Sequence, residues 1–491
     1  MALAERPRQP WLAALLSFFV PGLGQAYLGR WTIAVMLVIP FVIVVAATTA
    51  VWLIGMDALR SQVFSTPFLL GVFVLNASLL AWRVFAIAHA GLAGRGRARP
   101  AGNRSWRSQA SLASVVLLVL TSVAMHAYVG MVVIQLNDTL GEVFTELRGD
   151  GGPSVGEPDD GDEEGRDPDD SPPFVWDGRE RVNFLLIGVD EAPGRDASLT
   201  DTILAMIIDP VDESGVMISI PRDTGFMPLA SSSLYTAGLY PYKINQLAAE
   251  AAANPSTWCP EMVINDADDA TECGIATLQE TVSLYLGVPI NYYARVDIAG
   301  FERLIDAVGG VELCLPGRLV DPLYSDSVTG QRGLELPAGC SRYDGASALA
   351  YARSRQGWIE MPDGTREQQN DFLRADRQQE ILLALRNELD DANLLFDLPR
   401  LLDAFGSLVE TDFPRSRAGD LATLVPLVAG PSIERVVLGH PEFVDLPVHP
   451  EANYLLTPRR DSVRDGMEDL LGEEGMLDGW YLGSSGDAPS R

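Results

Sequence analysis

Long apolar segments in the first part of the chain restrict what it can fold into. Residues 31–54, 67–90 and 111–135 are each long enough to cross a bilayer core, which takes about 20 apolar residues in a helix. An earlier segment, residues 11–28, is interrupted by a Pro-Gly-Leu-Gly-Gln sequence, so its continuous apolar run is short for a span. We therefore expect residues 1–140 to form a helical membrane unit with three spans, in which residues 11–28 are either a re-entrant segment or a fourth span.

Arginine residues orient this unit. The segment from residue 91 to residue 110 contains arginine at positions 95, 97, 99, 104 and 107. Loops rich in Lys and Arg stay on the cytoplasmic side of a membrane, so residues 111–135 are expected to lead outward. The sequence therefore predicts a multi-pass protein of the cell membrane, whose chain after residue 135 is extracytoplasmic.

The composition changes twice after the last apolar segment. Residues 141–180 are rich in Gly, Pro, Asp and Glu, a composition that cannot bury a core and is typical of a disordered acidic linker. In residues 181–491, strand-like and helix-like patterns alternate. Such alternation predicts one α/β domain, with a central mixed β-sheet flanked by helices.

Individual elements can be predicted in the second half of this domain. Asp344 is a helix N-cap candidate, and Gly309-Gly310 is a helix stop. The expected elements are strands at 292–296, 311–315 and 434–438, helices at 298–308, 345–351, 371–389 and 459–471, and a polar loop at 316–342.

The four cysteines, Cys259, Cys273, Cys314 and Cys340, all follow residue 250. An even number of well-separated cysteines fits two disulfides in an oxidising compartment. Three pairings are possible, of which we favour the ones near in sequence, Cys259 with Cys273 and Cys314 with Cys340. The alternative is four buried free thiols.

Composition also excludes some functions. The net charge of -30 argues against sequence-independent binding of nucleic acid, since that function needs a basic face. The four histidines do not cluster with one another or with cysteines at metal-ligand spacing, which argues against a zinc site and a His-based catalytic triad.

Charged residues stand at the ends of three predicted strands between residues 182 and 224. Asp190 ends the first apolar run, Asp201 begins the second, and Arg222 follows the third. Carboxylates hold Mg²⁺ and guanidinium groups bind phosphate, so the pattern suits a metal-bridged phosphate site. The alternative is that the aspartates are turn formers.

Basic residues further along the chain could bind the same phosphate. Lys243 is the only lysine in the chain, and its compact ammonium group suits a point contact. Arg353 and Arg355 stand two residues apart after a predicted helix, where an extended backbone would point both to one face. The alternatives are an ordinary surface lysine and two exposed arginines paired with nearby acids.

A third group lies on the helix predicted from residue 371. Asp371, Arg374 and Gln378 have the i, i+3, i+7 spacing of one helix face, so they could line a polar pocket from its first two turns. As an isolated pattern, this spacing is equally typical of a solvent-exposed face.

Taken together and in order, these motifs resemble those of the LytR–CpsA–Psr family of membrane-anchored extracytoplasmic proteins. The matching pieces are Gly188-Val-Asp190, Thr200-Asp-Thr202, Ser219-Ile-Pro-Arg-Asp223, Lys243-Ile-Asn245, Leu286-Gly-Val-Pro-Ile-Asn-Tyr-Tyr293, Asp306-Ala-Val-Gly-Gly-Val311, Ala348-Leu-Ala-Tyr-Ala-Arg-Ser-Arg355 and Asp371 to Gln379.

The resemblance implies a transferase that moves a phosphoglycan from a polyprenyl (pyro)phosphate carrier to a hydroxyl of peptidoglycan, with Mg²⁺ (or Mn²⁺) bridging the phosphates. Carried over by motif, Asp190 and Asp201 would hold the metal, and four arginines would clamp phosphate oxygens. These arginines are Arg222, Arg353, Arg355 and Arg374. The implied substrate-binding residues are Lys243, Gln378, Asp371 and Arg377. The implied partners are the lipid-linked donor, peptidoglycan and the membrane, and no nucleic acid.

One position departs from the family pattern. The family often has an arginine two residues before the aspartate of the Thr-Asp-Thr motif, where this chain has Leu199. Either Arg195 replaces it from the preceding loop, or one phosphate contact is missing. Two other functions stay open from the sequence: a pyrophosphatase acting on the same lipid-linked glycan with water as acceptor, and a non-catalytic lipid-binding regulator of the envelope.

Overall fold

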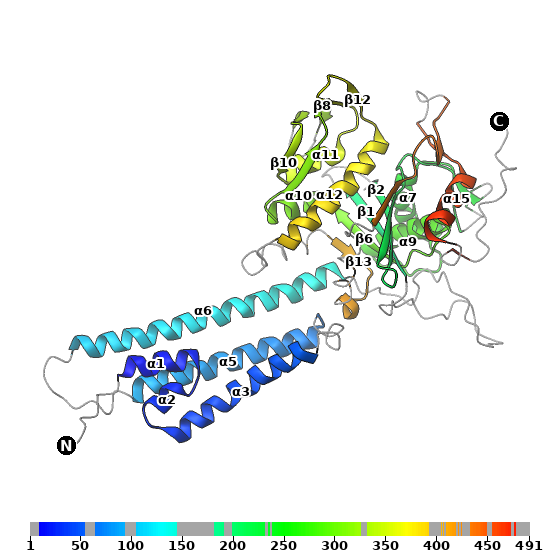
Figure 1. The fold of residues 1–491 in the computed structure, drawn as a ribbon. Coiled ribbons are helices and arrows are strands. Elements are labelled where there is room, and N and C mark those ends of the chain that lie inside the picture. Colours follow the sequence, from blue (N-terminus) through cyan, green and yellow to red (C-terminus); the bar gives the residue numbers. More distant parts are fainter. Residues whose placement is uncertain are drawn as a thin grey trace, which may run out of the picture. The chain divides into compact units, whose positions relative to one another are not determined.

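The computed structural model divides the chain into two compact units, residues 1–138 with 416–419 and residues 139–415 with 420–491, which we call the helical unit and the sheet unit (Figure 1). Each unit is considered by itself. The described residues are 9–54, 64–93, 105–144, 181–190, 199–230, 234–235, 238–325, 331–391, 404, 406, 409–418, 421, 424, 433–448, 454–472 and 476–477.

Apolar helices build the N-terminal part of the chain. They are α1 (Pro10–Phe19), α2 (Leu23–Tyr27), α3 (Trp31–Ile54), α5 (Thr66–Ala93) and α6 (Ser105–Val143). Within the described residues, Thr66–Ala93 and Leu112–Val143 are long and apolar enough to cross a membrane, and Pro10–Phe19 and Trp31–Ala47 are shorter apolar helices. The number of spans, and whether residues 11–28 cross the bilayer, stay predictions.

Buried polar contacts fasten the short helices to α5. The Ser17 hydroxyl donates to Gln25 Oε1 at 2.9 Å, and Gln25 Nε2 donates to the carbonyl oxygen of Ala86 at 2.9 Å. Gln25 is fully buried. Since a polar group in an apolar surrounding must find a partner, these bonds specify how α1 and α2 pack on α5.

A six-stranded sheet forms the centre of the sheet unit, in the order β13-β6-β1-β2-β3-β14. Its strands are β1 (Val182–Asp190), β2 (Leu199–Asp209), β3 (Ser214–Ser219), β6 (Tyr292–Asp297), β13 (Val409–Thr411) and β14 (Ile433–Val437). β1 pairs antiparallel with β2 and parallel with β6, and β3 pairs antiparallel with β2 and parallel with β14. The predicted mixed sheet is therefore confirmed, with all three strands expected between residues 182 and 224.

The two faces of this sheet pack against different layers because side chains alternate along each strand. Leu185 and Ile187 of β1, with Ile203 and Ala205 of β2, belong to a core that also contains side chains of α7, α9 and α15. The opposite layer has its own core, made from α10, α11, α12 and the strands between them. In Figure 1 these two groups of helices lie on opposite sides of β1, β2 and β6.

The helices of this unit are α7 (Leu247–Ala253), α8 (Pro255–Trp258), α9 (Ala267–Leu286), α10 (Ile298–Ala307), α11 (Gly345–Arg353), α12 (Asp371–Asp391) and α15 (Arg460–Leu471), with 3-10 turns at Ile244–Gln246 and Arg415–Arg417. The predicted helix cap is confirmed, because the Asp344 side chain accepts from the Ser347 N–H at 2.9 Å. The predicted stop after α10 is confirmed as well, since Gly309 and Gly310 have φ values of 88° and 91°, which favour glycine.

The remaining strands are β4 (Met227–Pro228), β5 (Leu239–Tyr240), β7 (Val311–Leu315), β8 (Arg318–Ser325), β9 (Arg332–Leu336), β10 (Gly339–Tyr343), β11 (Trp358–Glu360), β12 (Arg366–Gln368), β15 (Val444–Asp445) and β16 (Thr457–Pro458). The prediction of a loop over residues 316–342 was wrong, because β8, β9 and most of β10 lie there. These strands are short and carry Pro and Gly, which resemble turn signals in isolation. Hydrogen bonds to neighbouring strands stabilise them as β structure: β8 pairs with both β9 and β11, and β10 pairs with β7.

Both disulfides join the cysteines that are near in sequence, as predicted. Cys259 and Cys273 link the segment after α8 to α9, and Cys314 and Cys340 lie directly opposite each other on β7 and β10. The alternative of four free thiols was therefore wrong.

Candidate active site

A β-bulge places Asp201 at the centre of the candidate site. Along β1 and β2, Val189 pairs with Thr200 and Gly188 pairs with Thr202, so Asp201 is the extra residue between two regular pairs. Strict alternation would turn residue 201 to the same face as Ile203, in the core against α9. The bulge re-aims it, as bulges next to functional sites often do, and Asp201 and Thr202 both line a cavity on the other face.

Glycine is required opposite the bulge. A Cβ at Gly188 would lie 2.8 Å from Thr202 Cβ and 2.9 Å from its hydroxyl oxygen, closer than non-bonded atoms approach. The Gly-Val-Asp motif of β1 therefore has a packing role, since it lets the bulged strand come near enough to present Asp201.

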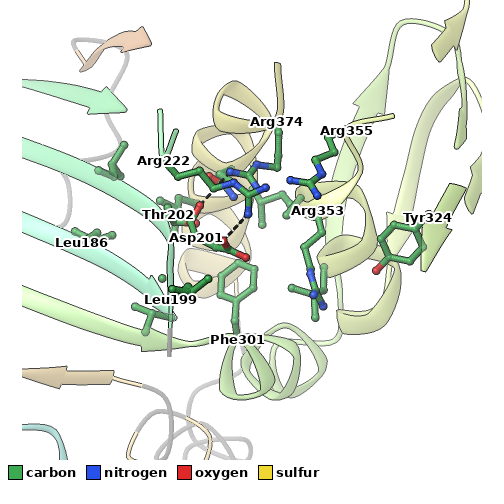
Figure 2. Close-up of a pocket in the computed structure, with 18 of the residues that line it drawn as sticks. Leu186, Leu199, Asp201, Thr202, Arg222, Phe301, Tyr324, Arg353, Arg355 and Arg374 are labelled. Atoms are coloured by element: carbon green, nitrogen blue, oxygen red, sulfur yellow. Dashed lines mark hydrogen bonds and ion pairs between the residues drawn. The ribbon is translucent and has the colours of Figure 1, made fainter. Parts of the chain in front are cut away.

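Four arginines line the same cavity as Asp201, which has a volume of about 500 Å³ (Figure 2). They come from three separate segments: Arg222 after β3, Arg353 and Arg355 at and beyond the end of α11, and Arg374 on α12. Gln378 lines the same cavity one turn further along α12. Figure 2 shows Arg222, Arg355 and Arg374 converging at one end, while Arg353 extends away from them.

Apolar side chains form much of the rest of the lining. They include Leu186, Leu204, Val296, Phe301, Leu349, Ile381 and Leu382. The cavity thus has a cationic part and an apolar part, an arrangement suited to an amphipathic anion.

Arg222 and Arg374 are held by two carboxylates. Arg222 Nη1 donates to Asp201 Oδ1 at 2.5 Å, and its Nε lies 3.8 Å from Asp371 Oδ1. Arg374 Nη2 donates to Asp371 Oδ2 at 3.2 Å and to the backbone oxygen of Asp201 at 3.1 Å. Within the described residues, the Nε atoms of Arg222 and Arg374 and the Oδ1 atom of Asp371 are buried without a hydrogen-bond partner.

Burial and charge act in opposite directions on these groups. Burial raises the pKa of Asp371, and the charges of Arg374 and Arg222 oppose this rise. Burial lowers the pKa of Arg374. For Arg222 burial also acts to lower the pKa, but the charges of Asp201 and Asp371 prevail and raise it. Arg222 is thereby kept cationic inside the site.

A buried aspartate that sequence reasoning missed positions the Arg353–Arg355 segment. Asp321 is 1% exposed, and its Oδ2 accepts from the Ser354 hydroxyl at 2.8 Å and from the Arg355 N–H at 3.3 Å. It lies on β8, in the region expected to be a loop, so the local sequence carried no signal for it. Only the pairing of β8 brings it beneath the arginines.

Arg377 supports the same segment. Its side chain is buried, and its guanidinium donates to the carbonyl oxygen of Tyr351 at 2.9 Å, to the carbonyl oxygen of Ser354 and to Gln369 Oε1. It does not line the cavity. The geometry therefore gives Arg377 a positioning role, where the sequence suggested substrate binding.

The remaining predicted residues are Lys243, Asp190 and Arg195. Lys243 forms an ion pair with Asp223, Nζ to Oδ1 at 2.7 Å, and is not in the cavity lining. Asp190 ends β1, where its backbone pairs with Leu199, and its side chain lies outside the described part of the structure. Arg195 also lies outside the described residues, so its replacement for the arginine absent at position 199 stays a prediction.

The residues at the bulge fit a magnesium ion that is shared with phosphate. Asp201 is an oxygen ligand at the cavity wall, and Mg²⁺ typically takes one or two carboxylates together with phosphate oxygens and water. Among the residues that the structure describes, one group of three side chains could ligate a metal by itself, namely Glu312, Cys314 and Cys340. It is not in the cavity lining, and its two sulfurs already form a disulfide. A metal at the cavity would thus depend on ligand oxygens from the substrate.

The chain is similar to one known protein family and to several known proteins. A family model described as LytR_cpsA_psr family matches residues 159–440. One relative is the polyisoprenyl-teichoic acid–peptidoglycan teichoic acid transferase TagU of Oceanobacillus iheyensis, 28% identical over 246 residues, which are 50% of this chain and 63% of TagU. Another is the cell wall biosynthesis protein LcpA of Corynebacterium glutamicum, 30% identical over 210 residues, which are 43% of this chain and 36% of LcpA. The match thus spans less than two thirds of either relative.

Among solved structures, Bacillus subtilis TagV is similar with a TM-score of 0.42 and 22% sequence identity, covering 59% of this chain and 97% of TagV.

Proposed function

This chain belongs to the LytR–CpsA–Psr family, and on that premise we propose that it transfers a phosphoglycan from a polyprenyl (pyro)phosphate carrier to a hydroxyl of peptidoglycan. The observation that carries the proposal is the cavity itself. Its four arginines supply positive charge that can neutralise a phosphate, and its apolar lining suits the first part of a lipid chain. Relatives such as TagU, a teichoic acid transferase by name, support the same reaction class.

Phosphoryl transfer depends mainly on positioning and on neutralising charge, so the arrangement of Arg222, Arg353, Arg355 and Arg374 is the main catalytic device. The guanidinium groups of Arg222 and Arg374 are oriented by Asp201 and Asp371, and Asp321 holds the backbone N–H of Arg355. Guanidinium groups held as those of Arg222 and Arg374 are need no reorganisation when negative charge develops on the phosphate oxygens.

In the reaction, an acceptor oxygen bonds to the phosphorus that carries the glycan, and the bond from that phosphorus to the bridging oxygen breaks. The lipid leaves as polyprenyl phosphate. Asp201, together with Asp190, would hold Mg²⁺ or Mn²⁺, which when bound neutralises phosphate charge. One of these two carboxylates would also take the proton of the acceptor hydroxyl.

We also propose that the protein is a multi-pass protein of the cell membrane with its sheet unit outside the cell. The apolar helices Thr66–Ala93 and Leu112–Val143 support membrane insertion. The five arginines between residues 91 and 110 support a cytoplasmic position for that segment, and the two disulfides support an oxidising compartment for the sheet unit.

The full chain in detergent or lipid nanodiscs, incubated with Mg²⁺, a polyprenyl-pyrophosphate glycan and peptidoglycan fragments, tests the proposal by mass spectrometry of the products. A phosphodiester between glycan and peptidoglycan is the expected product. Release of lipid phosphate without such a linkage would show hydrolysis instead. If neither product forms, and Arg222→Ala binds the donor as tightly as the wild type, the site has been misassigned.

A further inference from the structure

A short segment near the C-terminus is fastened beside the arginine cavity. The N–H of Leu456 donates to the carbonyl oxygen of Asp223 at 2.9 Å, and the N–H of Gly225 donates to the carbonyl oxygen of Leu456 at 2.9 Å. The Leu455 side chain packs against Gly225 so closely that a Cβ added at Gly225 would lie 2.5 Å from Leu455 Cδ1. Tyr454 is thereby brought next to the residues that directly follow Arg222.

The Lys243 loop is fastened to the same place. The N–H of Ile244 donates to the carbonyl oxygen of Thr224 at 2.8 Å, and the N–H of Asn245 donates to the carbonyl oxygen of Arg222 at 3.3 Å. Lys243 Nζ lies 2.7 Å from Asp223 Oδ1 and 5.9 Å from the centre of the Tyr454 ring. Lys243 and Tyr454, with the largely buried Asp223 beneath the lysine, therefore lie together, and we call these three residues the Tyr454 surface.

The Tyr454 surface differs in charge from the cavity. The ammonium of Lys243 is neutralised by Asp223, whereas the arginines of the cavity outnumber their carboxylates. The Tyr454 side chain is 38% exposed, so part of its ring remains open to a ligand. Partial burial, and then the charges of Asp223 and Asp371, raise the pKa of the Tyr454 phenol.

This combination fits a neutral sugar better than an anion. An aromatic ring packs against the apolar C–H face of a pyranose, and the neighbouring ammonium and carboxylate supply a donor and an acceptor for its hydroxyls. An anion would gain little from a lysine that is already paired, and it would meet the charge of Asp223.

We propose that the Tyr454 surface binds a sugar ring of the polysaccharide acceptor, and so presents its hydroxyl to the phosphate held by Arg222 and Arg374. The inference rests on the proposed function, since it assigns the acceptor side of the same site. The donor occupies the arginine cavity, and the acceptor approaches from the segment formed by residues 223, 243 and 454.

The test compares the full chain with Tyr454→Ala, Tyr454→Phe and Val211→Ala in detergent. Val211 is the control, because it is 74% exposed in the turn that follows β2, at the opposite end of that strand from Asp201. Two binding constants are measured for each variant, one for a polyprenyl-pyrophosphate disaccharide and one for peptidoglycan glycan strands freed of stem peptides. The Michaelis constant for the same glycan strands is measured in the transfer assay.

Tyr454→Ala is expected to weaken glycan binding and raise the Michaelis constant for the glycan about tenfold, the order expected for loss of one aromatic contact, with donor affinity retained. Tyr454→Phe keeps the ring and is expected to remain within about twofold of the wild type, as is Val211→Ala. Unchanged glycan binding in Tyr454→Ala would overturn the inference, and so would a matching loss of donor affinity.

Failure of the proposed function gives a different result. If the wild type forms no phosphodiester product, the transferase assignment fails, and the direct glycan-binding measurement still decides the role of Tyr454. Glycan binding that is lost in Tyr454→Ala and retained in Tyr454→Phe would then leave a polysaccharide-binding surface beside a site of other chemistry.

Discussion

Replacing Arg377 with methionine tests whether this arginine supports the site or binds its ligand. Arg377 is 5% exposed, and its three partners are the carbonyl oxygens of Tyr351 and Ser354 and the side chain of Gln369. Its guanidinium also lies 5.3 Å from the centre of the Tyr351 ring. Methionine has a similar length and stays apolar, so the substitution removes these bonds while keeping most of the packing.

The expected loss of stability can be worked from these contacts. A hydrogen bond from a charged donor contributes roughly 1.5–3 kcal/mol, and removing the buried charge itself offsets part of the loss of three such bonds, so the net cost is about 3–5 kcal/mol. With a shift of about 2–4 °C in Tm per kcal/mol for a domain of this general size, Arg377→Met should lower the Tm of the sheet unit by roughly 10 °C. Loss of the bond to Ser354, which stands between Arg353 and Arg355, should lower transfer as a secondary effect.

Differential scanning fluorimetry and donor-binding measurements on the full chain check this expectation. Arg366→Met is the matched control, because Arg366 is exposed and forms an ion pair with Glu360 at 3.2 Å, worth up to about 1 kcal/mol. Arg366→Met should therefore change the Tm by no more than about 3 °C. The reasoning is refuted if Arg377→Met keeps the wild-type Tm but weakens donor binding tenfold, since Arg377 would then contact the ligand.

Three further outcomes follow from other contacts. Gly188→Ala should lower transfer by about a hundredfold, because its Cβ displaces Thr202 and the Asp201 bulge, whereas Gly215→Ala meets its nearest atom at 3.4 Å and should retain activity in the same transfer assay. Asp321→Asn should weaken donor binding about tenfold in a titration with the lipid-linked disaccharide, because the uncharged amide holds Ser354 and the Arg355 N–H less firmly. Burial raises the pKa of Asp412 to about 7, although the hydrogen bond from the Tyr293 N–H acts to lower it. Between about pH 4 and pH 7 the folded protein therefore keeps a proton on Asp412 that the unfolded chain has released. The free energy of unfolding should therefore fall by up to about 1.4 kcal/mol per pH unit between roughly pH 4 and pH 7, and denaturant unfolding of Asp412→Asn should lose this slope.

Local signals in the sequence were sufficient for much of the fold. The three strands between residues 182 and 224 are short apolar runs bounded by turns, and each formed where the pattern indicated. The cap at Asp344 and the glycine stop after α10 depend only on backbone geometry within a few residues. The disulfides joined cysteines whose separations are short, 14 and 26 residues.

The strands β8 to β10 show where local signals end. Their Pro and Gly residues suggested a loop, and their pairing partners lie in other segments, including β11 and β7. Because β structure obtains its hydrogen bonds from residues far away in sequence, a short strand with turn-forming residues cannot be recognised from its own composition. Asp321 was missed for this reason.

The sequence by itself determined the chemistry of the candidate site: carboxylates at strand ends, arginines at and beyond the end of α11 and on α12, and apolar segments that suit a membrane. Tertiary structure decided the role of each residue. A bulge in β2 directs Asp201 into the cavity, and Arg377 donates to the backbone of Ser354. Lys243 pairs with Asp223, and Tyr454 lies beside them. The physical reason is that residue type sets what a side chain can bind, whereas the long-range packing of strands and loops sets which partner it meets.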